Sequence, residues 1–196
     1  MAKAKLIKRS RKSWICSSCG KTIPVGSSYY KGEIAFNPAI IRCTDCGLHD
    51  WEVTSSEYQR SVGEIVHLWQ ETYGVTESSP EDVSAALEDI KGTCEDNLDN
   101  IPENLQENYV ATLLQERIDS LESAIDLLDA IDIDDLKQDV ANDYSNMHLS
   151  DEEKDMELSF DDIIDRHGSY TESKLNDMLE SAIEMEIDEA LSEIEV

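Results

Sequence analysis

The residues best able to do chemistry are four cysteines arranged as two Cys-x-x-Cys-Gly turns. The first turn contains Cys16 and Cys19, the second contains Cys43 and Cys46, and 23 residues separate Cys19 from Cys43. Two cysteines at this spacing can bind one metal ion while backbone N–H groups of the same turn donate to the thiolates, and the following glycine permits a positive φ. Four thiolates at tetrahedral spacing suit Zn²⁺. The pattern therefore predicts one structural zinc ion.

Other interpretations of these cysteines are open. Two disulfides would leave a fifth cysteine, Cys94, unpaired, and no apolar signal-peptide region follows the basic N-terminus. An iron site of rubredoxin type uses the same four-sulfur geometry, although the second turn lacks the proline that such carriers usually have. A catalytic zinc would need an open coordination position, which four cysteines do not leave. His49 follows Cys46 by three residues and could compete as a ligand.

The formal net charge of −28 is unevenly distributed along the chain. Residues 1–75 contain 10 Lys/Arg and 7 Asp/Glu, a net of +3, whereas residues 76–196 contain 6 Lys/Arg and 37 Asp/Glu, a net of −31. No apolar run approaches the roughly 20 residues that span a bilayer. We therefore expect a cytoplasmic protein without a membrane segment, in the host cytoplasm if it is viral. The expected parts are a basic arm (1–12), a zinc ribbon with its following helix (13–75) and an acidic helical region (76–196).

The N-terminal arm is a candidate nucleic-acid-binding segment. It carries six cations and no acid, so it could neutralise several phosphates and bind nucleic acid in a salt-dependent way. It could also fold back onto the acidic half of the chain or stay solvated. The six cations are Lys3, Lys5, Lys8, Arg9, Arg11 and Lys12.

The residues between the two cysteine turns have the pattern of short strands. Trp14-Ile15 leads into the first turn, and β-rich runs at 29–36 and 39–42 follow. With its two cysteine turns, the segment 13–52 resembles the zinc-ribbon group, in which a small antiparallel sheet holds two such turns together. A treble-clef variant stays open because a helix is expected after the second turn. The expected small core consists of Trp14, Tyr29, Tyr30, Phe36 and Trp51.

The remainder of the chain predicts helices, so the fold class is α+β with a mainly α-helical acidic region. Leucine and isoleucine in one stretch step by 4, 3, 4 and 3 residues, which is a coiled-coil-like seam of just over two heptads. A hairpin within one chain or a dimer could bury that seam, which consists of Leu114, Ile118, Leu121, Ile125 and Leu128. Helices are expected over 54–73, 79–101, 108–131 and 136–144 and from Thr171 to the end, with an acidic linker over 146–162.

A second resemblance concerns the helical region. Residues 100–106 and 114–122 are similar to a segment of many uncharacterised bacteriophage proteins. The resemblance implies a viral origin and no particular activity.

Motifs of known catalytic chemistry are absent from the sequence. It contains no Gly-rich phosphate loop, no Gly-x-Ser-x-Gly elbow and no His-Glu-x-x-His helix, and its four histidines are scattered. We therefore expect a non-enzymatic binding or adaptor protein. Its ribbon would contact nucleic acid or a nucleic-acid-bound machine, and its helices would contact a protein partner or self-associate. The alternatives are an acidic nucleic-acid mimic that inhibits a host protein and a rubredoxin-like electron carrier.

Overall fold

The protein is an α+β chain in which short strands come first and helices follow. The computed structural model describes residues 4–33, 38–150, 153, 156 and 158–194. The chain divides into two compact units, here called the N-terminal unit (residues 1–64) and the helical unit (residues 65–195). The division falls inside helix α1 (Glu57–Tyr73), whereas the charge pattern places a boundary near residue 76.

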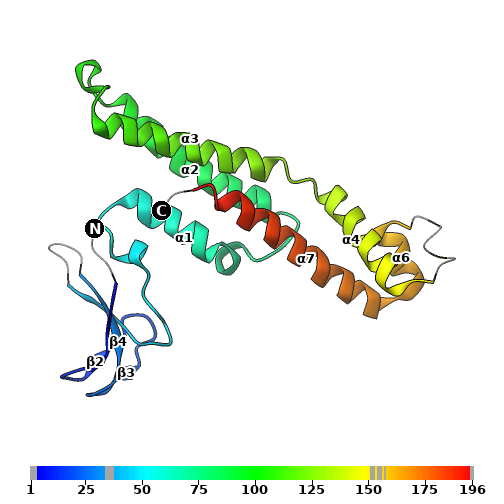
Figure 1. Cartoon of the computed structure of the whole chain (residues 1–196), viewed down its shortest axis with the longest axis horizontal. Helices are drawn as coiled ribbons and strands as arrows, with labels where there is room; N and C mark the ends of the chain where they lie inside the picture. Colours follow the sequence, from blue (N-terminus) through cyan, green and yellow to red (C-terminus); the bar gives the residue numbers. More distant parts are fainter. Residues whose placement is uncertain (1–3, 34–37, 151–152, 154–155, 157, 195–196) are drawn as a thin grey trace. The chain divides into compact units, whose positions relative to one another are not determined.

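Two small antiparallel sheets form the β-structure of the N-terminal unit (Figure 1). Strand β4 lies between β1 and β5, with Leu6 opposite Tyr30 and Tyr30 opposite Arg42. Strands β2 and β3 pair with each other, and the first cysteine turn connects them. The strands are β1 (Lys5–Ile7), β2 (Trp14–Ile15), β3 (Thr22–Ile23), β4 (Tyr29–Gly32) and β5 (Ile40–Arg42).

The described part of the basic segment differs from the separate arm that the sequence predicts. Lys5–Ile7 is strand β1 of the three-stranded sheet. The loop after it is anchored at Ser10, which is buried. The backbone N–H of Ser10 donates to the Ser27 carbonyl at 2.8 Å, and the Gly26 N–H donates to the Ser10 carbonyl at 2.9 Å. The cations around Ser10 therefore stand on a loop held to the sheet structure, because backbone hydrogen bonds fix its centre.

The core of the N-terminal unit is small and includes the cysteines. Tyr29 is buried and Trp14 packs beside it, with ring centroids 6.1 Å apart. Both residues belong to the small aromatic core expected from the sequence. Tyr30 is only half-buried, and Phe36 lies outside the described residues. The cluster consists of Cys16, Ile23, Tyr29 and Ile41, with Ile7, Trp14, Cys43 and Cys46 packed against it.

The second cysteine turn leads into a short 3-10 helix, η1 (Asp50–Val53), and then into α1. The predicted helix over 54–73 begins three residues later, after Ser56, whose side chain accepts a hydrogen bond from the Gln59 N–H at 3.3 Å. Gly74 ends the helix with φ +73°, a conformation that glycine adopts without steric cost. A helix thus follows the second turn, but only after η1.

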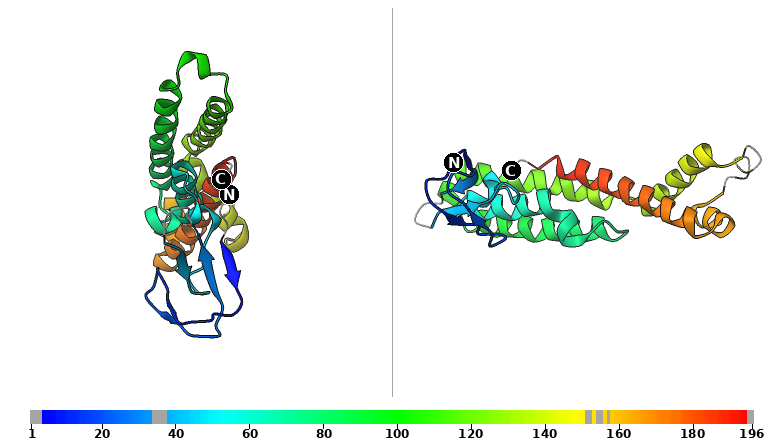
Figure 2. Two further views of the ribbon diagram at one scale, coloured as in Figure 1. Left: turned by 90° about the vertical axis from the view of Figure 1, so that its left-hand side faces the viewer. Right: turned by 90° about the horizontal axis from the view of Figure 1, so that it is seen from below.

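The described part of the helical unit contains the second half of α1, a hairpin, a long C-terminal helix and two shorter helices. Helices α2 and α3 form the hairpin, and α7 contacts α2, α3, α4 and α6 (Figures 1 and 2). Helix α7 is therefore the element that joins the helical unit together. The elements are α2 (Ser79–Asp99), η2 (Glu103–Leu105), α3 (Tyr109–Asp129), α4 (Ile133–His148), α6 (Phe160–His167) and α7 (Ser169–Leu191).

The predicted seam is buried within the chain. All five of its residues are at most 8% exposed, and α3 packs on α2 as an intramolecular hairpin requires. Asn108 caps α3 by accepting from the Ala111 N–H at 3.0 Å. On α1, the Trp69 indole N–H donates to the Asp188 carboxylate of α7 at 3.0 Å. The packing of α3 on α2 buries the apolar face that the periodic sequence predicts.

The C-terminal third differs in detail from the sequence-based expectation. Helix α4 is longer than the predicted 136–144, and the eight-residue helix α6 has no counterpart in the prediction. Ser159 begins α6 with a capping box in which its hydroxyl accepts from the Asp162 N–H. The expected linker at 146–162 lies partly outside the described residues, but α4 and α6 occupy both of its ends. Among the described residues, no helix combines the length and apolar composition that crossing a membrane requires.

Candidate metal centre

The four cysteines stand on two similar turns. Cys16 directly follows β2 and Cys43 directly follows β5, so strands position the first cysteine of each turn. Within each turn the glycine N–H donates to the carbonyl of the first cysteine, at 3.0 Å for Gly20 and 3.2 Å for Gly47. Both glycines have positive φ, +70° and +64°. The Cys-x-x-Cys-Gly pattern therefore folds locally as its residue types predict.

The four sulfur atoms converge on one point. All lie within 4.8 Å of one another, and the sulfurs of Cys19 and Cys43 are 3.8 Å apart. A tetrahedral ion with Zn–S bonds of about 2.3 Å would place its sulfur ligands about 3.8 Å apart. The donor set and its spacing fit one metal ion. Because four cysteines fill all four tetrahedral positions, such an ion would be structural and would offer no site for substrate.

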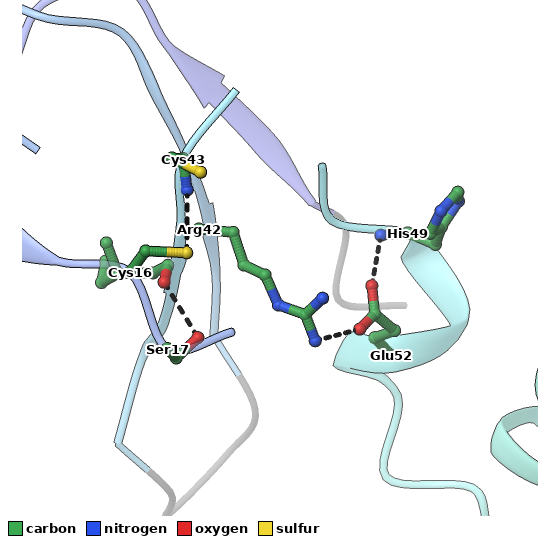
Figure 3. A network of polar contacts seen from close by, with 7 residues as sticks. Cys16, Ser17, Arg42, Cys43, His49 and Glu52 are labelled. Carbon is green, nitrogen blue, oxygen red and sulfur yellow. Dashed lines mark hydrogen bonds and ion pairs between the residues drawn. The ribbon is translucent and has the colours of Figure 1, made fainter. Parts of the chain in front are cut away.

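Backbone and hydroxyl hydrogen bonds hold the two turns against each other (Figure 3). The backbone N–H and the hydroxyl of Ser17 both donate to the Ile41 carbonyl of β5, at 2.8 and 2.9 Å. The Cys43 N–H donates to the Cys16 sulfur at 3.4 Å. An exposed ion pair of Lys21 with Asp45, at 3.5 Å, also links the turns. The first turn is thus attached to the strand that leads into the second.

The environment of the sulfurs separates their pKa values. Burial works to raise the pKa of the Cys16 thiol, but hydrogen bonds from the backbone of Cys19, Cys43 and Ser18 outweigh it and lower that pKa to about 6. Hydrogen bonds with the sulfurs of Cys43 and Cys19 raise the pKa of Cys46 to about 12. Without a cation the cluster therefore favours a thiolate at Cys16 and keeps a proton on Cys46. A divalent cation would take the place of the shared protons, because metal ligation requires thiolates.

His49 and the fifth cysteine, Cys94, are not part of this cluster. The four-cysteine group found among the described residues does not include His49, whose ring points away from the cysteines in Figure 3. That ring stacks on Trp51, with centroids 5.8 Å apart. Cys94 lies on α2, where it is 3% exposed, and burial raises the pKa of its thiol. The sequence predicts this burial, because Cys94 falls on the apolar stripe of the helix expected over 79–101, and the structure confirms it.

The described candidate nucleic-acid-binding cations precede and follow Ser10 in the sequence. Lys3 lies outside the described residues. Lys12 places its ammonium 4.0 Å from the centroid of the Trp14 ring, a cation–π contact that holds this side chain beside the sheet. The described cations, all exposed, are Lys5, Lys8, Arg9, Arg11 and Lys12.

Some residues that support the centre were not identified from the sequence. Glu52 accepts hydrogen bonds from Arg42 and from the His49 N–H, and Ser17 ties the first turn to β5. In the sequence, Arg42 directly precedes Cys43, so its charge could offset that of the thiolates, but nothing there indicates a partner at residue 52. No periodicity or short motif connects residues 42 and 52, so the tertiary structure was needed to pair them.

Comparison with protein-family models, with curated proteins and with solved structures finds no match. The case for a metal centre therefore depends on the four sulfur donors and their geometry.

Proposed function

We propose that the protein is a non-enzymatic adaptor in which a zinc-stabilised ribbon contacts nucleic acid and the acidic helices contact protein. Two features of the N-terminal unit carry this proposal: four cysteine sulfurs that converge on one point, and an exposed basic loop that backbone hydrogen bonds hold in place. The basic loop is defined here as residues 8–12. It contains four cations and no acid, and its centre is fixed by the buried Ser10.

Zinc is the proposed ion because it favours four-coordinate thiolate sites and needs no redox partner. Iron of rubredoxin type would fit the same sulfurs. Purified full-length protein should contain one zinc per chain by elemental analysis and should be colourless. Visible thiolate-to-iron absorption in the freshly purified protein would identify the bound ion as iron and favour the electron-carrier alternative.

The charge of the N-terminal unit supports a phosphate partner. Residues 1–64 contain 10 Lys/Arg and 6 Asp/Glu, a net of +4, whereas residues 65–196 contain 6 and 38, a net of −32. A zinc ion with four thiolates would contribute −2, so the N-terminal unit would remain positive. Cations held on a folded loop lose less conformational entropy on binding than cations on a flexible arm.

The test is binding of the full chain to duplex DNA and to RNA, measured by fluorescence anisotropy across a salt series. Serine substitution of Lys8, Arg9 and Arg11 should weaken binding and reduce the slope of log affinity against log salt by on the order of 2–3 for DNA. The matched control replaces three cations of the helical unit, Lys91, Lys137 and Lys174, and changes the net charge equally. If the wild type does not bind even at low salt, or if both triple variants weaken binding equally, the nucleic-acid role of the loop is wrong.

The tip of the α2–α3 hairpin supports the protein-contact half of the proposal. Three large apolar side chains within six residues are exposed there: Leu105 by 46%, Tyr109 by 78% and Val110 by 54%. Several large apolar side chains exposed in one short segment indicate an interaction site more strongly than a single exposed residue does. Sedimentation equilibrium over a concentration series tests self-association. A concentration-dependent oligomer that becomes monomeric when all three are changed to serine supports a contact between copies, whereas a monomer at all concentrations leaves only a different protein as partner.

The second candidate function is an acidic nucleic-acid mimic, favoured by the net charge of −32 on residues 65–196. Carboxylates on helices could occupy a basic, nucleic-acid-binding surface of another protein. The full chain would then displace DNA from a DNA-binding protein while not binding DNA itself. Failure to displace DNA at low salt would remove this alternative.

A further inference from the structure

The short helix η1 docks on three neighbouring elements of the N-terminal unit through consecutive side chains. Trp51 packs against Gly63 of α1 so closely that a Cβ on the glycine would lie 2.4 Å from the indole Cγ. Val53 is fully buried, and a Cβ on Gly32 of β4 would lie 2.0 Å from its Cγ1. A larger residue at either glycine position would clash with a side chain of η1. The helix is therefore held at Trp51 and Val53, on either side of its third residue, Glu52.

Glu52 binds both ends of the loop that carries the second cysteine turn. One carboxylate oxygen pairs with the guanidinium of Arg42, and the other accepts from the backbone N–H of His49 at 2.8 Å (Figure 3). Arg42 directly precedes Cys43, and His49 follows Cys46 by three residues. A single side chain therefore closes the loop from residue 42 to residue 49.

The Arg42–Glu52 ion pair is partly buried, so its loss should affect the stability of the loop more than loss of an exposed pair would. The Arg42 and Glu52 side chains are 25% and 13% exposed, and the Arg42 Nε is buried without a hydrogen-bond partner among the described residues. Loss of the carboxylate would leave a partly buried guanidinium poorly compensated. The Lys21–Asp45 pair also lies at the cysteine turns, but its side chains are 69% and 72% exposed. Ion pairs as exposed as this one contribute little to stability.

We propose that Glu52 is a positioning residue that holds Cys43 and Cys46 in place and slows release of the metal ion. This inference depends on the proposed metal site and extends it to a residue that does not contact the ion. The first turn has its own attachment, since Ser17 donates to Ile41. Opening of the loop on loss of Glu52 should therefore affect the second pair of cysteines selectively.

The first test is metal release from the full-length, zinc-loaded protein to an excess of a chromogenic chelator. Glu52→Gln keeps the size of the side chain and removes its charge, and it should release zinc about tenfold faster, as changes in residues supporting a metal site commonly do. Glu52→Asp keeps the charge on a shorter side chain, so its rate of zinc release should lie between those of the wild type and Glu52→Gln. Glu33→Gln is the matched control, because it makes the same change at the exposed carboxylate that pairs with Lys31 outside both cysteine turns, and it should leave the rate unchanged.

The second test separates positioning from a general loss of stability. Zinc-loaded protein is treated briefly with N-ethylmaleimide, and the modification of each cysteine is measured by peptide mass spectrometry. In Glu52→Gln the initial rates at Cys43 and Cys46 should rise relative to Cys16, while Cys94 of the helical unit serves as an internal reference. An equal acceleration at Cys16, Cys43 and Cys46 would mean that the N-terminal unit is merely destabilised, and would overturn the proposal.

The outcomes also separate this inference from the proposed function. Wild-type protein that binds no metal under any loading condition would overturn both. A zinc-loaded wild type with a Glu52→Gln variant that releases zinc at the wild-type rate would overturn only the positioning role. Loss of DNA binding alone would leave the positioning role intact, because neither readout involves nucleic acid.

Discussion

The two units of this chain differ in the interactions available to stabilise them. Of the twelve largest fully buried side chains among the described residues, ten lie in the helical unit, and only Val53 and Val62 lie in the N-terminal unit. The helical unit buries leucine and isoleucine along helices of up to 23 residues. The N-terminal unit has strands of two to four residues, and cysteine sulfurs form part of its core. Hydrophobic burial can account for the stability of the helical unit, but the N-terminal unit requires another source of stability.

Metal binding is the source that its residues offer. A small sheet supplies few kcal/mol of hydrophobic stabilisation, whereas apparent binding free energies of structural zinc in small domains are roughly 10–16 kcal/mol. With the proposed ion bound, the stability of the N-terminal unit would depend on metal, whereas that of the helical unit would not.

Removal of the metal should have the largest effect, and it should be confined to one unit. We expect a strong chelator, or Cys43→Ser, to abolish the dispersed amide signals of residues 4–60 in a ¹⁵N correlation spectrum, while helical circular dichroism falls only slightly. Acidification should act in the same direction, because protons compete with the metal for the thiolates and affinity falls as pH falls. Cys94→Ala is the control, since it removes a thiol that is not part of the cluster. Equal loss of signals from both units would show that they are not independent.

The sequence predicted the features that depend on local spacing. The two cysteine turns, the glycine conformations, the seam on α3 and the burial of Cys94 all follow from residues a few positions apart. The sequence Ser79-Pro80 favours a helix in which Ser79 is the cap and Pro80 the first residue, but α2 begins at Ser79 itself. Local cap signals cannot resolve this shift of one residue. Helix α6 was missed because eight residues give little periodicity, although Ser159 and Asp162 form a capping box. The Arg42–Glu52 and Trp51–Gly63 contacts depend on tertiary packing, for which the sequence contains no short-range signal.

A core substitution in the helical unit should produce the reverse pattern. Leu121 lies on the seam of α3 and is fully buried, so Leu121→Ala should lower the free energy of unfolding of the helical unit by about 2–5 kcal/mol. Leu127 on the same helix is 45% exposed, and Leu127→Ala should cost at most about 0.5 kcal/mol. Chemical denaturation followed by circular dichroism measures both, and zinc content should stay at one per chain. Loss of zinc from Leu121→Ala would contradict the independence of the two units.

Glycine-to-alanine changes should have the smallest effects and opposite signs in the two units. A Cβ added at Gly47 would meet no atom within 4 Å, so Gly47→Ala tests only the backbone, whose φ of +64° costs a non-glycine residue roughly 1–2 kcal/mol. Zinc affinity should therefore fall by about tenfold, since 1.4 kcal/mol corresponds to one decade. Gly92 lies inside α2 with equally open surroundings, and Gly92→Ala should stabilise the helical unit by about 0.5–1 kcal/mol, because alanine loses less backbone entropy in a helix. Competitive zinc titration measures the first change and thermal unfolding the second. If alanine at residue 47 left zinc affinity unchanged, the positive φ of the second turn would not be a requirement of the site, and the argument from the Cys-x-x-Cys-Gly spacing would lose its conformational basis.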